Sequence, residues 1–165
     1  NDTMTEEVRS DTIADASVLS GAADQPESSA EANPISSSTG ETYEVQMRNQ
    51  GTDGVMVFEP SVLRIEVGDS VTWVPKDPGH NVEFLAGPEG YEIPPRSFMN
   101  RKVTMTFEKP GIYLYVCTPH AMMGMVGLVV VGNDVSNKEA IANYDDKSTL
   151  GGKGLRKAKK LVGDL

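Results

Sequence analysis

The chain has 165 residues, a net charge of −9, two histidines and one cysteine. This length suits one ordinary domain rather than two large ones. The acidic balance argues against non-specific binding to nucleic acid or to an anionic membrane, and no intramolecular disulfide can form. Two histidines are too few for a site that needs three imidazoles. The longest apolar run, 125–131, is far shorter than the roughly 20 residues of a membrane-spanning helix.

Residues 1–42 have a composition unlike the rest of the chain. They carry nine acids, one base and no aromatic residue. Such a segment buries too little apolar surface to offset the entropy lost on ordering. We therefore expect an acidic, disordered arm or tether over 1–42, with one candidate short helix at 4–16, and a folded domain over 43–165. We expect the arm to aid solubility; the alternative is that it covers a basic surface and competes with a partner.

Residues 43–131 contain short runs in which apolar and polar residues alternate. A period of two residues is typical of strands that bury one face. Further runs are rich in β-branched and aromatic residues, and Gly and Pro separate them. The predicted strands lie at 43–47, 63–67, 71–74, 81–85, 103–107, 112–116 and 126–131. Seven or eight short strands at this spacing predict an all-β antiparallel sandwich or barrel.

The tail from 132 to 165 has helical features. Ser136 or Asn137 is a candidate N-cap for a helix that runs to about 144. A second helix is predicted to begin after Gly154 and to run to 162, with its apolar residues three and four positions apart on one face. We expect this helical tail, about 136–163, to pack on one side of the sandwich.

One loop holds most of the residues with distinctive chemistry. Cys117, the only cysteine, ends a predicted strand, and His120 follows three residues later. Three methionines come next, at 122, 123 and 125, and His80 precedes another strand. Taken singly, a lone Cys, a lone His and a Met are more often structural than metal-binding. Their concentration in nine residues favours a metal site.

Thiolate, thioether and imidazole donors together suit copper in both of its common oxidation states. Two His and one Cys can form a trigonal plane with a weak axial Met, and such a site takes up and releases one electron with little rearrangement. Three alternatives use the same residues. They are a copper trafficking or storage site without a redox role, a structural zinc site, and a Cys–His hydrolase, for which no third orienting residue is evident.

The sequence resembles the type I blue-copper proteins, the cupredoxins, and most closely the pseudoazurins, over about 43–162. The motifs that carry the resemblance lie at 54–60, 68–73, 79–83, 117–120 and 123–125. The resemblance implies an all-β Greek-key cupredoxin sandwich with two C-terminal helices. It also implies one type I copper ion with His80, Cys117, His120 and Met125 as ligands.

The axial ligand has two candidates within this resemblance. Met125 lies five residues after His120, as in pseudoazurins and plastocyanins, whereas Met123 lies three residues after, as in the shorter amicyanin loop. Gly124 fits the longer loop, so we expect Met125. The resemblance also implies support by Asn81, whose backbone N–H bonds the Cys sulfur and whose side chain joins the two ligand loops. Thr118 and Pro119 stiffen the ligand loop.

The resemblance implies a one-electron carrier and not an enzyme, with electrons leaving through the exposed edge of His120. We expect a docking patch of Ala121, Met122 and Met123, with Lys76 and Lys102 beside it; Arg96, Arg101 and Lys109 are further candidate cations. Redox partners implied by the family are a copper nitrite reductase, a nitrous oxide reductase or a cytochrome. We expect a bacterial, periplasmic monomer that binds no nucleic acid and has no integral membrane span.

Overall fold

The computed structural model describes residues 40–165. The predicted helix at 4–16 and all but the last three residues of the predicted acidic arm lie outside the described residues. Within the described part, eight strands form two four-stranded sheets, and three helical segments follow or interrupt them. The strands are β1 (Thr42–Gly51), β2 (Gly54–Glu59), β3 (Val62–Ile65), β4 (Ser70–Pro75), β5 (Glu83–Ala86), β6 (Val103–Thr106), β7 (Gly111–Val116) and β8 (Val126–Val131).

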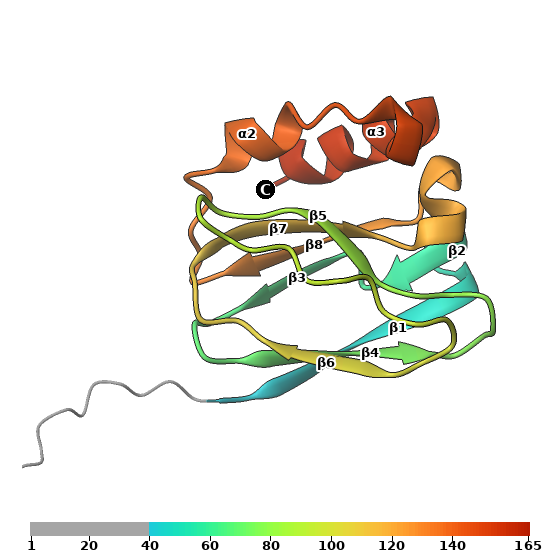
Figure 1. Ribbon diagram of the computed structural model, residues 1–165, viewed down its shortest axis with the longest axis horizontal. Coiled ribbons are helices and arrows are strands. Elements are labelled where there is room, and N and C mark those ends of the chain that lie inside the picture. The colour runs from blue at the N-terminus through green and yellow to red at the C-terminus, as the bar shows by residue number, and fades with distance from the viewer. Residues whose placement is uncertain (1–39) are drawn as a thin grey trace, which may run out of the picture. The chain divides into compact units, whose positions relative to one another are not determined.

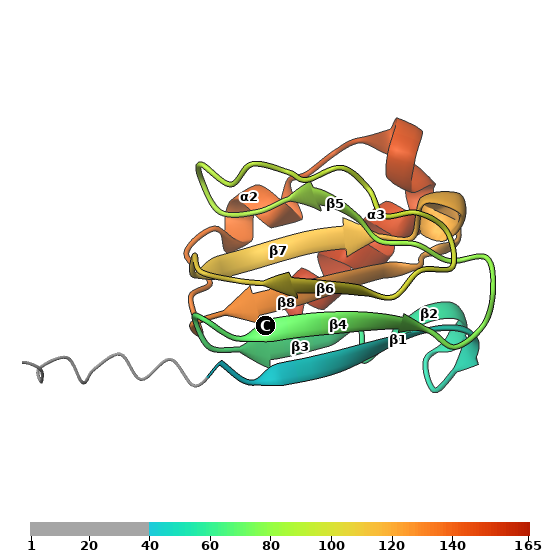
Figure 2. The same cartoon turned by 60° about the horizontal axis from the view of Figure 1, so that its bottom comes forward.

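The two sheets pack face to face as a sandwich (Figures 1 and 2). One has the strand order β2-β1-β4-β6 and the other β3-β8-β7-β5. The expected β-sandwich is confirmed, but its pairing is mixed: β1 with β4 and β3 with β8 run parallel, and the other pairs are antiparallel. Parallel neighbours require a connection that crosses to the other sheet and back, which a period-two pattern does not reveal.

Strands β7 and β8 are buried along their whole length because both faces are covered. Tyr113, Tyr115 and Cys117 point inward and join the core between the sheets. Ile112 and Leu114 point outward and join a second core beneath the helices. The inward row of β7 therefore leads directly to Cys117, and the covered strand holds that residue in a rigid part of the fold.

The C-terminal helices α2 (Lys138–Ala142) and α3 (Lys147–Gly163) pack on the sheet that contains β7 and β8, as expected (Figure 1). The predicted start of the second helix, after Gly154, is wrong. The Asp146 side chain accepts hydrogen bonds from the backbone N–H groups of Ser148 and Thr149, so a first turn forms earlier. Gly151 then breaks α3 with a positive φ of 62°. No helix in the described residues is long and apolar enough to cross a membrane.

Candidate metal centre

The structure brings three predicted ligands together from two separate segments. Cys117 is the first residue beyond β7, His120 lies in the 3-10 helix η3 (Thr118–Met123), and His80 lies between β4 and β5. The Cys117 Sγ atom is 3.6 Å from Nδ1 of His80 and 3.4 Å from Nδ1 of His120. The candidate ligand atoms of the three residues all lie within 4.8 Å of one another. Two imidazoles and a thiol that converge in this way fit copper better than a hard cation.

The ligand loop is held by its own backbone. The His120 N–H donates to the Cys117 carbonyl at 3.1 Å, and the Met125 N–H donates to the His120 carbonyl at 3.1 Å. Gly124 ends η3 in the left-handed region, with φ of 98°, a conformation that glycine adopts without strain. The Cys117 N–H then donates to the Met125 carbonyl at 3.1 Å and closes the loop. These bonds fix the spacing of the ligands before any metal binds.

The two candidate axial methionines have different environments. Met125 is fully buried in the core cluster that also contains Cys117. Met123 is 44% exposed and borders a surface cavity with Lys153 and Lys157. This difference in burial favours Met125 over Met123 as the thioether that would help to hold a copper ion beside Cys117.

Burial controls the protonation of the candidate ligands. Desolvation by burial raises the pKa of the Cys117 thiol, although the backbone N–H groups of Asn81 and His120 bond the sulfur and act in the opposite direction. Desolvation also lowers the pKa of His80 and of His120. The proximity of His120 lowers the pKa of His80 further, and Asp77 opposes this shift. The imidazoles are therefore kept neutral and ready to donate to a metal, while metal binding must displace a proton from Cys117.

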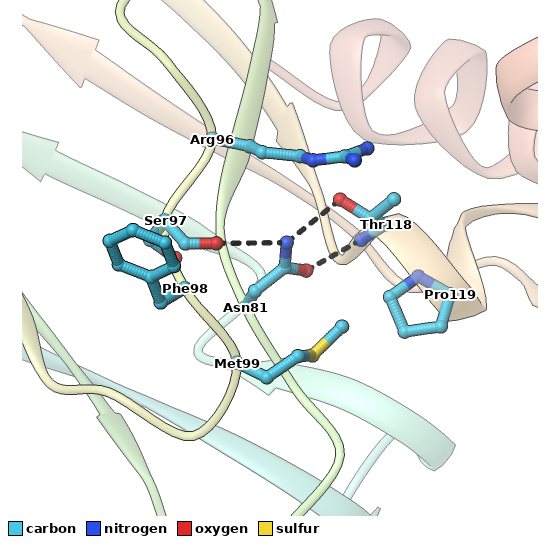
Figure 3. A pocket seen from close by; sticks show the side chains of 7 residues that line it. All are labelled: Asn81, Arg96, Ser97, Phe98, Met99, Thr118 and Pro119. Atoms are coloured by element: carbon cyan, nitrogen blue, oxygen red, sulfur yellow. Dashed lines mark hydrogen bonds between the residues drawn. The ribbon is translucent and has the colours of Figure 1, made fainter.

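Asn81 joins the His80 segment to the Cys117 loop through hydrogen bonds to Thr118. Its side-chain Oδ1 accepts from the Thr118 backbone N–H at 2.8 Å, and its Nδ2 donates to Thr118 Oγ1 at 2.9 Å (Figure 3). The Asn81 Nδ2 also donates to the Ser97 carbonyl at 3.3 Å. The two hydrogen bonds between Asn81 and Thr118 keep the His80 segment and the Cys117 loop at a constant separation. Pro119 follows Thr118 at the start of η3 and is exposed.

Two polar residues that sequence reasoning missed complete this network. Asn49, on β1, accepts a hydrogen bond at its Oδ1 from Nε2 of His80 at 2.8 Å. This contact requires a proton on Nε2 and leaves Nδ1 free to face Cys117. Glu83 accepts from Thr118 Oγ1 at 2.8 Å and fixes the direction of that hydroxyl. Asn and Glu are common, and no local pattern marks these two.

The expected docking patch is only partly at the surface. Met122 and Met123 are 55% and 44% exposed, and Lys76 and Lys102 are exposed. Ala121 is wrong as a patch residue because it is fully buried in the core beneath the helices. A 3-10 helix advances by three residues per turn, so η3 turns Ala121 inward toward α3 while the next two residues face out. A side chain at Gly154 of α3 would lie only 2.5 Å from the Ala121 carbonyl oxygen.

We expect the metal-free protein to lose stability as the pH falls below 6.5, the ordinary pKa of histidine. The folded-state pKa of both His80 and His120 is lowered, so in this window the unfolded chain binds more protons than the folded one. The stabilisation is complete above 6.5 and is lost as the pH falls through the folded-state values. Urea unfolding of the apo-protein over a pH series measures this effect.

The matched variant for this prediction replaces both His80 and His120 with glutamine. Because the chain has only two histidines, this double variant should show a flatter dependence in the same pH window. Equal slopes for the parent and the double variant would contradict the prediction.

A two-sheet sandwich that carries a His-Cys-His cluster, with Cys117 and His80 buried and a buried Met in the same loop, defines a cupredoxin. The family of copper binding proteins named plastocyanin/azurin matches residues 45–132. The chain belongs to this family of copper-binding proteins.

Individual relatives point to the pseudoazurins within this family. The pseudoazurin of Paracoccus pantotrophus is 48% identical over 101 residues, which cover 60% of this chain and 69% of that protein. The matched segment spans 66% to 69% of the length of three curated relatives. The solved pseudoazurin from Sinorhizobium meliltoi has a TM-score of 0.68 and 42% identity, and covers 75% of this chain and 95% of that one. That of Methylobacterium extorquens AM1 has a TM-score of 0.67 and 35% identity, covering 75% and 98%.

Proposed function

We propose that this protein is a one-electron carrier in which His80, Cys117, His120 and Met125 hold a single type I copper ion. The observation that carries the proposal is the convergence of two imidazole Nδ1 atoms on the buried Cys117 sulfur, with all three ligand atoms within 4.8 Å. Bound copper supplies a Cu(II)/Cu(I) couple. No substrate bond is made or broken, so we infer a carrier rather than an enzyme.

The residues around the ligands suit rapid electron transfer. Asn49 holds the His80 ring through Nε2, and the Asn81–Thr118 pair holds the Cys117 loop. Ligands that are fixed in advance need not move when the charge of the site changes. Hydrogen bonds from the backbone N–H groups of Asn81 and His120 to the Cys117 sulfur withdraw electron density, and we expect them to raise the reduction potential.

We infer that electrons pass through the partly exposed ring of His120. Gly79 borders the ring edge, since a Cβ atom at this position would lie 4.0 Å from His120 Cε1. Met122 and Met123 follow His120 in the same loop and expose apolar surface, which suits brief encounters of small area. Lys76 and Lys102 would steer acidic partners toward it.

The relatives support a setting for this activity. Several are named pseudoazurins and come from bacteria, so we propose a bacterial periplasmic location and partners that are redox proteins. A copper nitrite reductase, a nitrous oxide reductase or a cytochrome would each serve as donor or acceptor. We propose that the carrier acts as a monomer.

A visible spectrum tests this function directly. One equivalent of Cu(II) is added to the apo-protein, followed by ascorbate and then by a mild oxidant. We expect an intense blue or blue-green thiolate-to-copper band that bleaches and returns. A copper complex without a reversible colour change would favour trafficking, storage or a structural metal site.

Two methionine variants test the axial ligand. Met125→Leu should retain copper and its blue band but raise the reduction potential, because loss of the thioether disfavours Cu(II). Met123→Leu is the matched control and should leave the potential nearly unchanged, since this side chain lies at the surface. Cyclic voltammetry of both variants measures the difference. The reverse result would assign the axial position to Met123.

A further inference from the structure

The last ten residues of the segment between β5 and β6 form a basic and apolar ridge, and the exposed acids Glu89 and Glu92 precede it. Residues 93–102 contain three cations, Arg96, Arg101 and Lys102, and no acid. These cations form no salt bridge with another residue of the described part. Phe98 is 82% exposed, and the adjacent Met99 is 44% exposed. An aromatic ring that remains in water does not gain the free energy of burial, and an exposed apolar patch of this kind is typical of an interaction site.

The exposure of Phe98 is imposed by bonds on either side of it. On one side, the Ser97 N–H donates to the Val82 carbonyl, and Ser97 Oγ accepts from the Val82 N–H. On the other side, the Asn100 N–H donates to the His80 carbonyl at 2.9 Å, and Asn100 Oδ1 accepts from the Gly79 N–H at 2.6 Å. The chain is therefore fixed at both ends of the dipeptide, and Phe98 and Met99 project between two anchored positions.

A groove of about 390 Å³ lies beside this ridge. Phe98 and Met99 stand on one side of it and Pro119 on the other, with Asn81 and Thr118 between them (Figure 3). The Arg96 side chain extends across one end toward Thr118 (Figure 3). We call this cavity the Phe98 groove; its lining is Asn81, Arg96, Ser97, Phe98, Met99, Thr118 and Pro119.

Asn81 and Thr118, which line the Phe98 groove, lie next to the proposed copper ligand Cys117. Thr118 follows Cys117 in the chain, and the backbone N–H of Asn81 bonds the Cys117 sulfur. A molecule seated in the groove would thus lie a few bonds from that sulfur, beside but separate from the exposed edge of His120. His120 does not line the groove.

We propose that the Phe98 groove is a docking surface for an acidic redox protein, with Phe98 as its anchor. This inference rests on the proposed function, because the copper ion must supply or accept the electron. The partner is acidic because Arg96, Arg101 and Lys102 form no salt bridge with the described residues. Glu83 lines a pocket beside Arg96 and accepts a hydrogen bond from the Thr118 hydroxyl instead. The partner protein presents an apolar recess rimmed by carboxylates. One electron crosses through Thr118 or Asn81 to Cys117, and no bond forms or breaks.

Binding is tested first without electron transfer. The full chain in its Cu(I) form is labelled with ¹⁵N and titrated with ferrous cytochrome b5, a probe whose haem edge is rimmed by carboxylates. We expect the amide shifts to centre on Arg96, Phe98, Met99 and Thr118. Phe98→Ala should weaken binding about tenfold, as truncation of a central anchor does. Val135→Ala is the matched control: this side chain is 37% exposed, follows β8 at the opposite end of the sheet, and should change nothing.

Electron transfer is then followed by stopped-flow mixing of ferrous cytochrome b5 with the Cu(II) form. Phe98→Ala should slow the bimolecular reaction about tenfold. Arg101→Gln and Lys102→Gln should lower the rate and flatten its salt dependence, whereas Lys138→Gln, in α2, should not. Reduction by ascorbate should be the same for the parent and for Phe98→Ala. A parent protein that lacks the blue band or the ascorbate reaction would refute the proposed function. Where ascorbate cycling is unaltered, a slower reaction with cytochrome b5 reports on docking alone.

Other outcomes would overturn the docking proposal. Amide chemical-shift changes confined to His120, Met122 and Met123 would show that the partner does not bind at the Phe98 groove. Equal affinity of the parent and Phe98→Ala would show the same. If Phe98→Ala instead abolished co-sedimentation with vesicles of anionic phospholipid, the ridge would be a membrane contact. If it abolished self-association of this chain, the occupant would be a second copy. Either result would refute the acidic redox partner.

Discussion

Replacing Cys117 with serine is expected to remove the blue colour of the copper-loaded protein while the sandwich remains folded. The band arises from charge transfer between a soft thiolate and copper, and a serine hydroxyl stays protonated and is a poor copper ligand. The hydroxyl must also lie in a fully buried site, which costs about 1–3 kcal/mol of unfolding free energy. Visible absorption reports the site, and circular dichroism reports the fold.

The control for this prediction is Met122→Leu, which changes an exposed residue of the same loop. It should keep the full intensity of the band. A Cys117→Ser protein that retained the band would show that another residue supplies the coloured donor, and the whole ligand assignment would then fail.

Replacing Gly127 with alanine is expected to produce the largest loss of stability among single-methyl insertions in this fold. Gly127 pairs with Tyr115 across β7 and β8, and a Cβ atom would clash with Cζ, Cε2 and the hydroxyl oxygen of that tyrosine. Tyr115 is fully buried and packs against Phe58, Trp73 and other rings of the inner core, so it cannot move aside. We expect a loss of about 3 kcal/mol, measured as a shift in the urea midpoint.

The matched control is Gly163→Ala, because nothing lies within 4 Å of a Cβ at that position of α3. Its unfolding free energy should change by no more than about 0.5 kcal/mol. The Gly127 variant should also shift the blue band, since Tyr115 lies two residues before Cys117 on the same inward row of β7. Equal urea midpoints for the two variants would show that the tyrosine ring adapts freely.

The parts of the fold that were predictable from sequence are those in which a local pattern reports burial. The alternation in β1 and β6, and the unbroken apolar runs of β7 and β8, each indicate which faces are covered. The candidate ligands were predictable because Cys and His are scarce in this chain and occur close together. Strand partners were not, since parallel pairing depends on how chain segments cross between the sheets.

The features that sequence reasoning missed depend on contacts between distant residues. Asn49 reaches His80 across 31 positions, and Glu83 reaches Thr118 across 35. Apolar character alone places Ala121 with Met122 and Met123, whereas the rotation of η3 decides which of them faces water. The start of α3 was missed because the glycines at 151, 152 and 154 masked the cap at Asp146. In each case the deciding information is three-dimensional.

The glycines of α3 have a consequence for how long the protein keeps its metal. A side chain at Gly151 would approach Met122 within 3.2 Å, and one at Gly154 would approach the Ala121 carbonyl within 2.5 Å, so the helix lies directly against the ligand loop. Opening that loop far enough to expose Cys117 requires η3 to separate from α3. The free energy of local unfolding at the C-terminus therefore becomes part of the barrier to copper dissociation, and the residence time of the ion depends on a helix that supplies none of its proposed ligands.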